Sequence, residues 1–390
     1  MGKLPFVFGC DAHVAEPPNL YVDNMPGDLK QYAPNAETDG NTRITKIGDK
    51  VIMKIQADFF VHKVGIIKTA EDEGVELKRR GARDLELRLE DMKRDGVDAE
   101  LVFPSLGLMI PHIGDVEAER VACEIYNNWL WEYTAPVRQV LIAAAMIPCD
   151  DFDDALAEAQ RTIEMGFPAI CLWEGMGNYN DARWDSIFAL AAASEVPIVF
   201  HTATGHVSTR ALRGAGGAIS NYTRQMNDAI EVITQLVAGG VLDRNPDAHI
   251  TFAEHGAGWL WALGERMDEA YEGHRPYVEP KLSRMPSRIV ADQVHSAMQN
   301  DVGSVATRKG VGVGALLFAT DYPHSEGTFP FSRSVIERMM TENSDARMED
   351  FVAILGGNAA RLFKRAGVEE KVEERRRELV AARATIPPRR

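Results

Sequence analysis

Histidine and carboxylate side chains recur in this sequence at the ends of apolar segments. Five of them follow or close four such segments: Asp11, His13, His201, His255 and Asp321. Imidazole nitrogens and carboxylate oxygens together are ligands for Zn²⁺, Mn²⁺ or Fe²⁺ in proteins. A metal ion held in this way polarises a substrate oxygen and lowers the pKa of bound water towards about 7. A single histidine at a strand end is more often structural, but the joint pattern favours a metal site.

The segments that must position these side chains have the pattern of buried strands. The stretch 196–200 is apolar and leads directly to His201. A strand of a parallel sheet is covered on both faces and therefore shows nearly continuous apolar residues. His201 then lies at the C-terminal end of its strand, which is the functional end in an α/β barrel. Asp11 and His13 are two residues apart, so a strand directs both side chains to the same side.

The order of strands and helices predicts the fold class. Strand candidates alternate with helical sequence and cover residues 6–14, 99–104, 140–148, 167–173, 196–201, 248–255, 289–298 and 315–324. Amphipathic helices are expected at 85–96, 118–131, 151–165, 184–194, 222–238 and 258–271. This alternation indicates parallel βαβ units and an α/β fold of the (β/α)8 TIM barrel type. A doubly wound open sheet is the alternative, but no GxGxxG motif follows an early strand.

Residues 1–365 are expected to form this barrel, with two additions to the basic fold. Residues 21–83 are rich in Pro, Asn and Asp, and we interpret them as an insertion over the barrel mouth. The insertion contains a predicted β-hairpin at 44–55, whose turn lies at Gly48-Asp49. Residues 366–390 are dense in Glu and Arg, and we expect a charged helical tail there.

Composition limits the classes of partner. The 390-residue chain has a formal net charge of −15, which argues against binding to nucleic acid. No apolar run reaches the roughly 18 residues of a membrane span. Four cysteines are scattered without a CxxC pair, which is typical of reduced thiols in a cytosolic protein. We therefore expect a cytoplasmic protein, without membrane contact, whose partner is a small-molecule substrate.

The motifs around the candidate ligands resemble one known family. In chain order they are Asp11-Ala-His13-Val-Ala-Glu16-Pro, Phe103-Pro-Ser-Leu-Gly, His201, Glu254-His255-Gly-Ala-Gly-Trp259, Ala319-Thr-Asp321-Tyr-Pro-His324 and Gly357-Asn-Ala-Ala-Arg-Leu-Phe363. With these motifs the chain resembles the amidohydrolase superfamily. The most similar branch is the amidohydrolase-related group that includes aminocarboxymuconate semialdehyde decarboxylase and γ-resorcylate decarboxylase. The motifs extend from residue 11 to residue 363 and follow the order of the family.

The resemblance implies a role for each candidate residue. Asp11 and His13 match the first-strand ligands of a divalent metal ion. His201 matches the fifth-strand ligand, and Asp321 matches the eighth-strand ligand. His255 matches the sixth-strand histidine that contacts the metal-bound water or the substrate.

The sequence departs from the family pattern at two positions. Many members have His-x-His or Glu-x-His in the first strand, where this chain has Asp11. The aspartate suits Mn²⁺ or Fe²⁺ somewhat better than Zn²⁺. The bridging lysine of the fourth strand is absent, and that strand offers Trp173 instead. A two-metal hydrolase built on a carbamylated lysine is thereby excluded.

The leading hypothesis is a metal-dependent hydrolase or non-oxidative decarboxylase. It would act on a small carboxylate or amide, aromatic or unsaturated, and His255 or Asp321 would move the proton. Five further residues are candidates for substrate contacts: Phe103, Trp173, His206, Arg210 and Tyr322. The three aromatic residues would form an apolar wall or belong to the core. The two basic residues, in the loop after the fifth strand, would meet an anion or solvent.

Two other classes of function stay open in the sequence. The first is a dinuclear iron oxygenase on the same fold, in which Glu16, His255 and His324 complete a second metal position with Glu16 as the bridge. In the alternative interpretation Glu16 begins a turn before two prolines and His324 orients Asp321. The second class is a non-catalytic barrel retained as a partner subunit. The family resemblance also implies a homo-oligomer, most simply a dimer.

Overall fold

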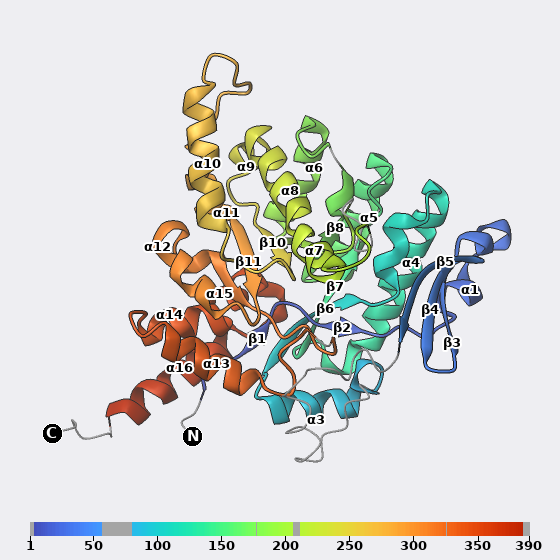
Figure 1. The fold of residues 1–390 in the computed structure, drawn as a ribbon, viewed down its shortest axis with the longest axis horizontal. Coiled ribbons are helices and arrows are strands. Elements are labelled where there is room, and N and C mark those ends of the chain that lie inside the picture. Colours follow the sequence, from blue (N-terminus) through green and yellow to red (C-terminus); the bar gives the residue numbers. More distant parts are fainter. Residues whose placement is uncertain (1–3, 57–79, 177, 206–210, 325, 385–390) are drawn as a thin grey trace.

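A closed barrel of parallel strands forms the centre of the molecule (Figure 1). The computed structural model describes residues 4–56, 80–176, 178–205, 211–324 and 326–384. The barrel strands are β1 (Phe8–Gly9), β6 (Ala99–Pro104), β7 (Leu141–Met146), β8 (Ala169–Leu172), β9 (Ile198–His201), β10 (Ile250–Ala253), β11 (Val294–Met298) and β12 (Leu316–Phe318). Neighbours in this order pair in parallel, and β1 closes the barrel because it pairs with both β6 and β12. The predicted (β/α)8 TIM barrel is confirmed.

The first barrel strand is interrupted beside the predicted ligands. After β1 the chain forms a second short strand, β2 (His13–Val14), which also pairs with β6, with His13 opposite Phe103. Asp11 lies in the interruption, and its carbonyl accepts a hydrogen bond of 2.8 Å from the backbone N–H of Asp321. The single strand predicted at 6–14 is therefore two segments, and the chain just after β12 bonds to the residue between them.

Helices surround the barrel (Figure 1). They are α1 (Leu20–Asn24), α3 (Leu85–Asp95), α4 (Val116–Tyr133), α5 (Phe152–Met165), α6 (Asp185–Ala193), α7 (Gly217–Arg224), α8 (Met226–Ala238), α9 (Val241–Arg244), α10 (Leu260–Gly273), α11 (Pro286–Gln293), α12 (Arg308–Val311), α13 (Ser332–Glu342), α14 (Met348–Val352), α15 (Asn358–Leu362) and α16 (Glu369–Ala384). Local signals set several ends. The side chain of Asp151 caps the start of α5, and Gly166, at φ 107°, ends that helix in the left-handed conformation.

Two predicted elements were wrong in part. The helix expected at 222–238 is two helices, α7 and α8, which meet at Gln225. The side chain of Gln225 accepts a hydrogen bond from the hydroxyl of Thr202, just after β9. This bond connects the junction of α7 and α8 to the barrel. The strand expected at 289–298 begins as helix α11, with Pro286 at its first position, and only its second half is β11.

A small antiparallel sheet lies beside the barrel (Figure 1), and its first strand contacts α1. It contains β3 (Pro34–Asp39), β4 (Thr42–Ile47) and β5 (Lys50–Gln56). The predicted hairpin is present, since β4 and β5 pair on either side of Gly48-Asp49. β3 was not predicted. The expected position of the whole 21–83 insertion over the barrel mouth stays a prediction.

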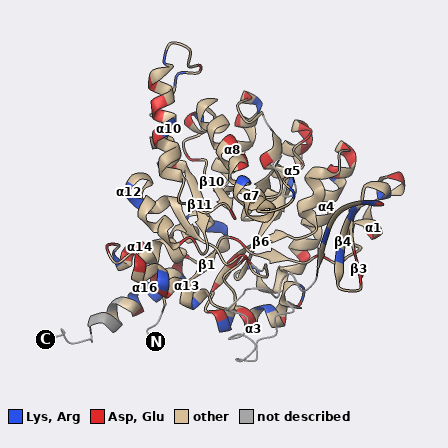
Figure 2. Cartoon of the chain, viewed as in Figure 1, with Lys and Arg blue, Asp and Glu red and all other residues tan. Residues whose placement is uncertain are grey.

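Charged residues lie mainly on the outer helices and on the small sheet, whereas the barrel strands carry few (Figure 2). The four cysteines are free and buried, as expected of reduced thiols. Among the described residues, no helix has the length and apolar character needed to cross a membrane. The charged tail is helical from Glu369 to Ala384.

Candidate metal centre

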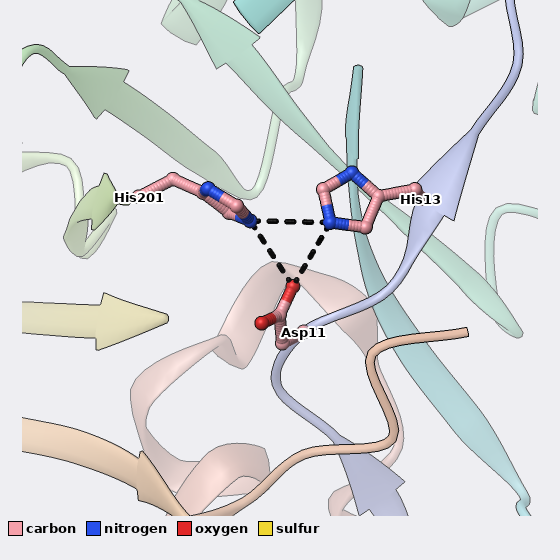
Figure 3. Close-up of side chains that lie close together, drawn as sticks. All are labelled: Asp11, His13 and His201. Atoms are coloured by element: carbon pink, nitrogen blue, oxygen red, sulfur yellow. Dashed lines mark hydrogen bonds and ion pairs between the residues drawn. The ribbon is translucent and has the colours of Figure 1, made fainter. Parts of the chain in front are cut away.

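Four of the predicted residues meet at the C-terminal ends of the barrel strands. His201 is the last residue of β9, and Asp321 follows shortly after β12. The Nε2 atom of His201 lies 3.3 Å from Oδ1 of Asp11 and 3.2 Å from Nε2 of His13 (Figure 3). The Nε2 atom of His13 lies 3.6 Å from Oδ1 of Asp11 and 3.5 Å from Oδ1 of Asp321. All four side chains are buried.

Hydrogen bonds fix the direction of the histidine lone pairs. The Nδ1 atom of His13 donates to the carbonyl oxygen of Pro104 at 2.8 Å, and Nδ1 of His201 donates to that of Thr202 at 2.8 Å. A carbonyl oxygen only accepts, so each Nδ1 carries a hydrogen, and each ring in its neutral form presents an Nε2 lone pair to the centre. Two such lone pairs 3.2 Å apart cannot bond to each other, whereas a shared cation would accept both.

The carboxylates of this cluster also lack hydrogen-bond donors in bonding alignment. Both oxygens of Asp11 and both of Asp321 are buried and accept no hydrogen bond from the described residues. A buried carboxylate is costly unless a cation or donor compensates its charge. Asp11, His13 and His201 offer ligand atoms within 4.8 Å of one another. Two imidazole nitrogens with carboxylate oxygens fit Mn²⁺, Fe²⁺ or Zn²⁺.

The titration of the cluster supports the same assignment. Burial, together with the nearby His324, lowers the pKa of His13 to about 4, so this ring is neutral at pH 7. Burial opposes a charge on His201, but the Asp11 carboxylate outweighs it and raises the pKa of that ring. Burial alone would raise the pKa of Asp321, but the imidazoles of His324 and His13 hold it below its usual range. The Asp321 carboxylate therefore stays charged beside the neutral ring of His13, as expected of a metal ligand.

His324 lies against two of these residues. Its Nδ1 atom is 2.8 Å from Oδ1 of Asp321, and its ring stacks on His13 with the centroids 4.0 Å apart. Burial opposes its charge, but the Asp321 carboxylate raises the pKa of His324 to about 9. This position agrees with the interpretation that His324 orients Asp321, although His13, Asp321 and His324 also form a second group of possible ligands.

His255 lies next to an acidic residue that the sequence analysis missed. Its Nε2 atom is 3.0 Å from Oε1 of Glu174, and both side chains are fully buried. The two groups are close without hydrogen-bond alignment, since neither the ring nitrogens nor the carboxylate oxygens have a hydrogen-bond partner among the described residues. Glu174 follows β8 directly after Trp173. A carboxylate just beyond a strand end is the signal that identified Asp321, and it was available here too.

Glu16 has a different role from the predicted metal bridge. Its Oε2 atom accepts the backbone N–H groups of Ser105 and Leu106 at 3.0 and 2.9 Å, and its Oε1 atom accepts that of Gly107 at 2.7 Å. Both oxygens are thus used to hold the loop after β6. Among the described residues, Glu16 and His255 belong to neither of the ligand groups around His13. The second metal position built on a bridging Glu16 finds no support in this geometry.

The predicted aromatic wall belongs largely to the core. Phe103 packs against His201 with the ring centroids 4.7 Å apart, and the hydroxyl of Tyr322 donates to Asp91 at 2.6 Å. Both residues and Trp173 are at most 2% exposed, and none of them lines the cavity described next. The other two predicted substrate contacts, His206 and Arg210, lie outside the described residues.

A cavity of about 520 Å³ adjoins the cluster. It is lined by Tyr222, Thr223, Met226, Glu254, His255, Gly256, Gly258, Trp259, Gln299, Asn300, Asp301, Ser304 and Glu326. Glu254 connects it to the cluster, because ligand atoms of Glu254, Glu326 and Asp321 lie within 4.8 Å of one another. Glu254 and Asp321 both have positive φ angles, 68° and 51°. Such strained backbone in non-glycine residues concentrates at functional sites.

A buried ion pair between Arg88 and Glu100 holds the backbone next to the cluster. The guanidinium of Arg88 donates to Oε2 of Glu100 at 2.9 and 2.6 Å, and its Nη1 donates to the carbonyl oxygen of His13 at 2.8 Å. The hydroxyl of Thr320 donates to Oε1 of Glu100 at 2.6 Å. This network holds the backbone of β2 and of the segment after β12, and therefore the residues that lie beside the centre.

Comparison with known proteins agrees with this geometry. A family model described as amidohydrolase matches residues 10–365. None of the curated proteins compared with the chain matches it. Many solved structures do match, and one is an amidohydrolase from Mycobacterium avium subsp. paratuberculosis K-10, with 19% identity and a TM-score of 0.74. That match covers 93% of this chain and 100% of the other.

Two further solved structures are decarboxylases. The 5-carboxyvanillate decarboxylase of Sphingomonas paucimobilis has 18% identity and a TM-score of 0.62, covering 92% of this chain and 99% of the other. A dihydroxybenzoic acid decarboxylase of Polaromonas sp. JS666, with bound manganese and an inhibitor, has 16% identity and a TM-score of 0.62, covering 93% and 97%. At these identities the likeness establishes a common fold.

Proposed function

The chain belongs to the amidohydrolase family and is a metal-dependent enzyme of that family, and on this premise we propose that it is a non-oxidative decarboxylase of small aromatic carboxylates. One observation carries the proposal. Two imidazole nitrogens and two buried carboxylates without aligned hydrogen-bond donors converge beside a cavity that the buried His255 lines. Decarboxylases of 5-carboxyvanillate and dihydroxybenzoate share the fold, which supports the choice of reaction.

Asp11, His13, His201 and Asp321 are the residues that would hold the metal, and we propose a single Mn²⁺ ion. When bound, a divalent ion polarises a substrate oxygen and stabilises negative charge that develops on the substrate. His324 would keep Asp321 oriented and His13 in place through its contacts with both. The backbone carbonyls of Pro104 and Thr202 would keep each imidazole in the tautomer that leaves Nε2 free to bind.

His255 is the proposed proton donor. In the reaction, the bond between the ring carbon and the carboxylate carbon breaks and CO₂ leaves. The electron pair that stays on the ring carbon takes a proton from His255. Glu174, 3.0 Å from Nε2, would stabilise the protonated imidazole, which leaves Nδ1 as the nitrogen that faces the substrate. A proton from solvent then restores His255.

A substrate panel with a proton-donor variant tests this proposal. Manganese-loaded protein is incubated with hydroxybenzoates and, separately, with aromatic amides, and CO₂ release and amide cleavage are measured. We expect CO₂ release from at least one hydroxybenzoate. His255→Gln should lower kcat about 100-fold or more, the usual effect of losing a general acid. His274→Gln, at the exposed end of α10, is the matched control and should leave kcat unchanged. Amide cleavage without CO₂ release, or a fully active His255→Gln, would contradict the proposal.

A further inference from the structure

The cavity beside the metal centre has an acidic wall. Glu254 and Glu326 line it, and their carboxylates lie within 4.8 Å of each other and of Asp321. Asp301 also lines the cavity, but its oxygens accept the backbone N–H groups of Gln299 and Ala257. No lysine or arginine is found among the described residues that line this space. An anionic group would therefore meet repulsion in this part of the cavity.

Glu254 is held towards this space without a countercharge. Glu254 directly follows β10 in a left-handed conformation, at φ 68°, that a non-glycine residue adopts only under constraint from its surroundings. Its carboxylate makes no hydrogen bond or ion pair within the described part of the chain. A cation in the cavity would supply the missing countercharge.

Two aromatic rings and one imidazole complete the cavity wall. Tyr222 and Trp259 line it, and the indole N–H of Trp259 donates to the carbonyl oxygens of His255 and Gly256 at 3.0 and 3.1 Å. The polar edge of the indole is therefore satisfied. The faces of such rings attract organic cations. The side chain of His255 is fully buried, and with Nε2 next to Glu174 its Nδ1 atom has no hydrogen-bond partner among the described residues, which indicates a bound ligand with a polar group here.

We infer that the cavity accepts a substrate with a protonated amine, which pairs with Glu254 and Glu326 and packs against Tyr222 and Trp259. This inference rests on the proposed function and deepens it, because the carboxylate of the same molecule would lie towards the metal centre. The substrate class is an aromatic carboxylate that also carries an amino group. A volume of about 520 Å³ suits a molecule of this size. A bare metal ion would not need the aromatic walls.

Three benzoates that differ in one group test the inference. They are 4-(aminomethyl)benzoate, which is cationic at that group, 4-(hydroxymethyl)benzoate, which is neutral there, and terephthalate, which is anionic there. Their binding to manganese-loaded protein is measured by isothermal titration calorimetry, which requires no turnover. We expect the amine to bind at least 10-fold more tightly than the alcohol, and terephthalate to bind most weakly.

Glu254→Gln should reduce the preference for the amine over the alcohol to less than 3-fold, while Glu272→Gln, on the exposed side of α10, should keep it. Glu326→Gln is the second variant if Glu254→Gln fails to fold, as judged by circular dichroism. Equal binding of amine and alcohol, or no binding of the amine, would overturn the inference. The inference would also be overturned if the wild-type protein bound two manganese ions and Glu254→Gln bound one, since Glu254 and Glu326 would then hold a metal ion. Preserved amine preference without any CO₂ release would refute the decarboxylase and leave this inference standing.

Discussion

Replacing Arg88 with methionine tests whether the buried network behind the metal centre is held by charge. Arg88 supplies two of the three hydrogen bonds to the Glu100 carboxylate, and both side chains are at most 2% exposed. In Arg88→Met the Glu100 carboxylate keeps, among the described residues, only the hydroxyl of Thr320 as a donor, and the carbonyl oxygen of His13 loses the Arg88 donor. Breaking a buried pair by removing one partner costs roughly 3–5 kcal/mol. We expect the free energy of unfolding to fall by about this amount.

The double variant Arg88→Met/Glu100→Met distinguishes two costs to stability: the loss of the ion pair, and the burial of an unpaired Glu100 carboxylate. It removes the unpaired carboxylate, and the hydroxyl of Thr320 keeps the carbonyl oxygen of Asp11 as an acceptor. Urea unfolding should therefore give a smaller loss for the double variant, about half that of Arg88→Met or less. Arg266→Met, from an exposed pair on α10, is the control and should be neutral. A loss below about 1 kcal/mol for Arg88→Met, or a double variant less stable than the single one, would refute this reasoning.

Two more predictions concern stability and the loop after β6. Burial lowers the pKa of His295 to about 3, so the folded protein keeps this ring neutral while the unfolded chain protonates it below about pH 6.5. The unfolded state then binds more protons, and the His295 contribution to stability is full above pH 6.5 and declines as the pH falls. Between pH 7 and pH 5 the free energy of unfolding should fall by about 2 kcal/mol because of this group. Urea unfolding at both pH values should show a smaller pH dependence in His295→Gln, and an unchanged slope would contradict the assignment. Glu16→Gln should speed amide hydrogen exchange at 105–107 and destabilise the protein by about 1–3 kcal/mol, because one amide oxygen cannot replace both carboxylate oxygens. Unchanged exchange together with a lost metal ion would restore Glu16 as a ligand.

The barrel was predictable from the sequence because its strands are buried on both faces. β6 and β7 are buried at every position, so they appear as apolar runs with clear ends. Where local signals were weak, the prediction was poorer. The β3 strand, at 34–39, is mostly polar and half-exposed, so only its pairing with β4 defines it. α11 was missed because its apolar residues continue directly into β11 without a breaker.

The candidate site was predictable because each residue lies at or near the C-terminal end of an apolar barrel strand. Asp11, His13, His201 and Asp321 come together because the barrel places the C-terminal ends of its strands around one axis. The partner of His255 was not predicted, although Glu174 carries the same strand-end signal as Asp321, because the prediction assigned the neighbouring Trp173 to the site instead. The structure places Glu174 beside His255 while Trp173 is buried in the core. Glu254 was likewise hidden, because its inward position depends on a left-handed backbone that local sequence does not specify.

The most direct test of the metal assignment is anomalous diffraction at the manganese absorption edge. Crystals of manganese-loaded protein should show one anomalous peak per chain, within about 2.0–2.3 Å of side-chain atoms of Asp11, His13, His201 and Asp321. Metal analysis of the same protein should give one ion per chain, and His201→Ala should lose it. An ion bound elsewhere, or a protein that binds no divalent metal while these four residues stay together, would contradict the assignment.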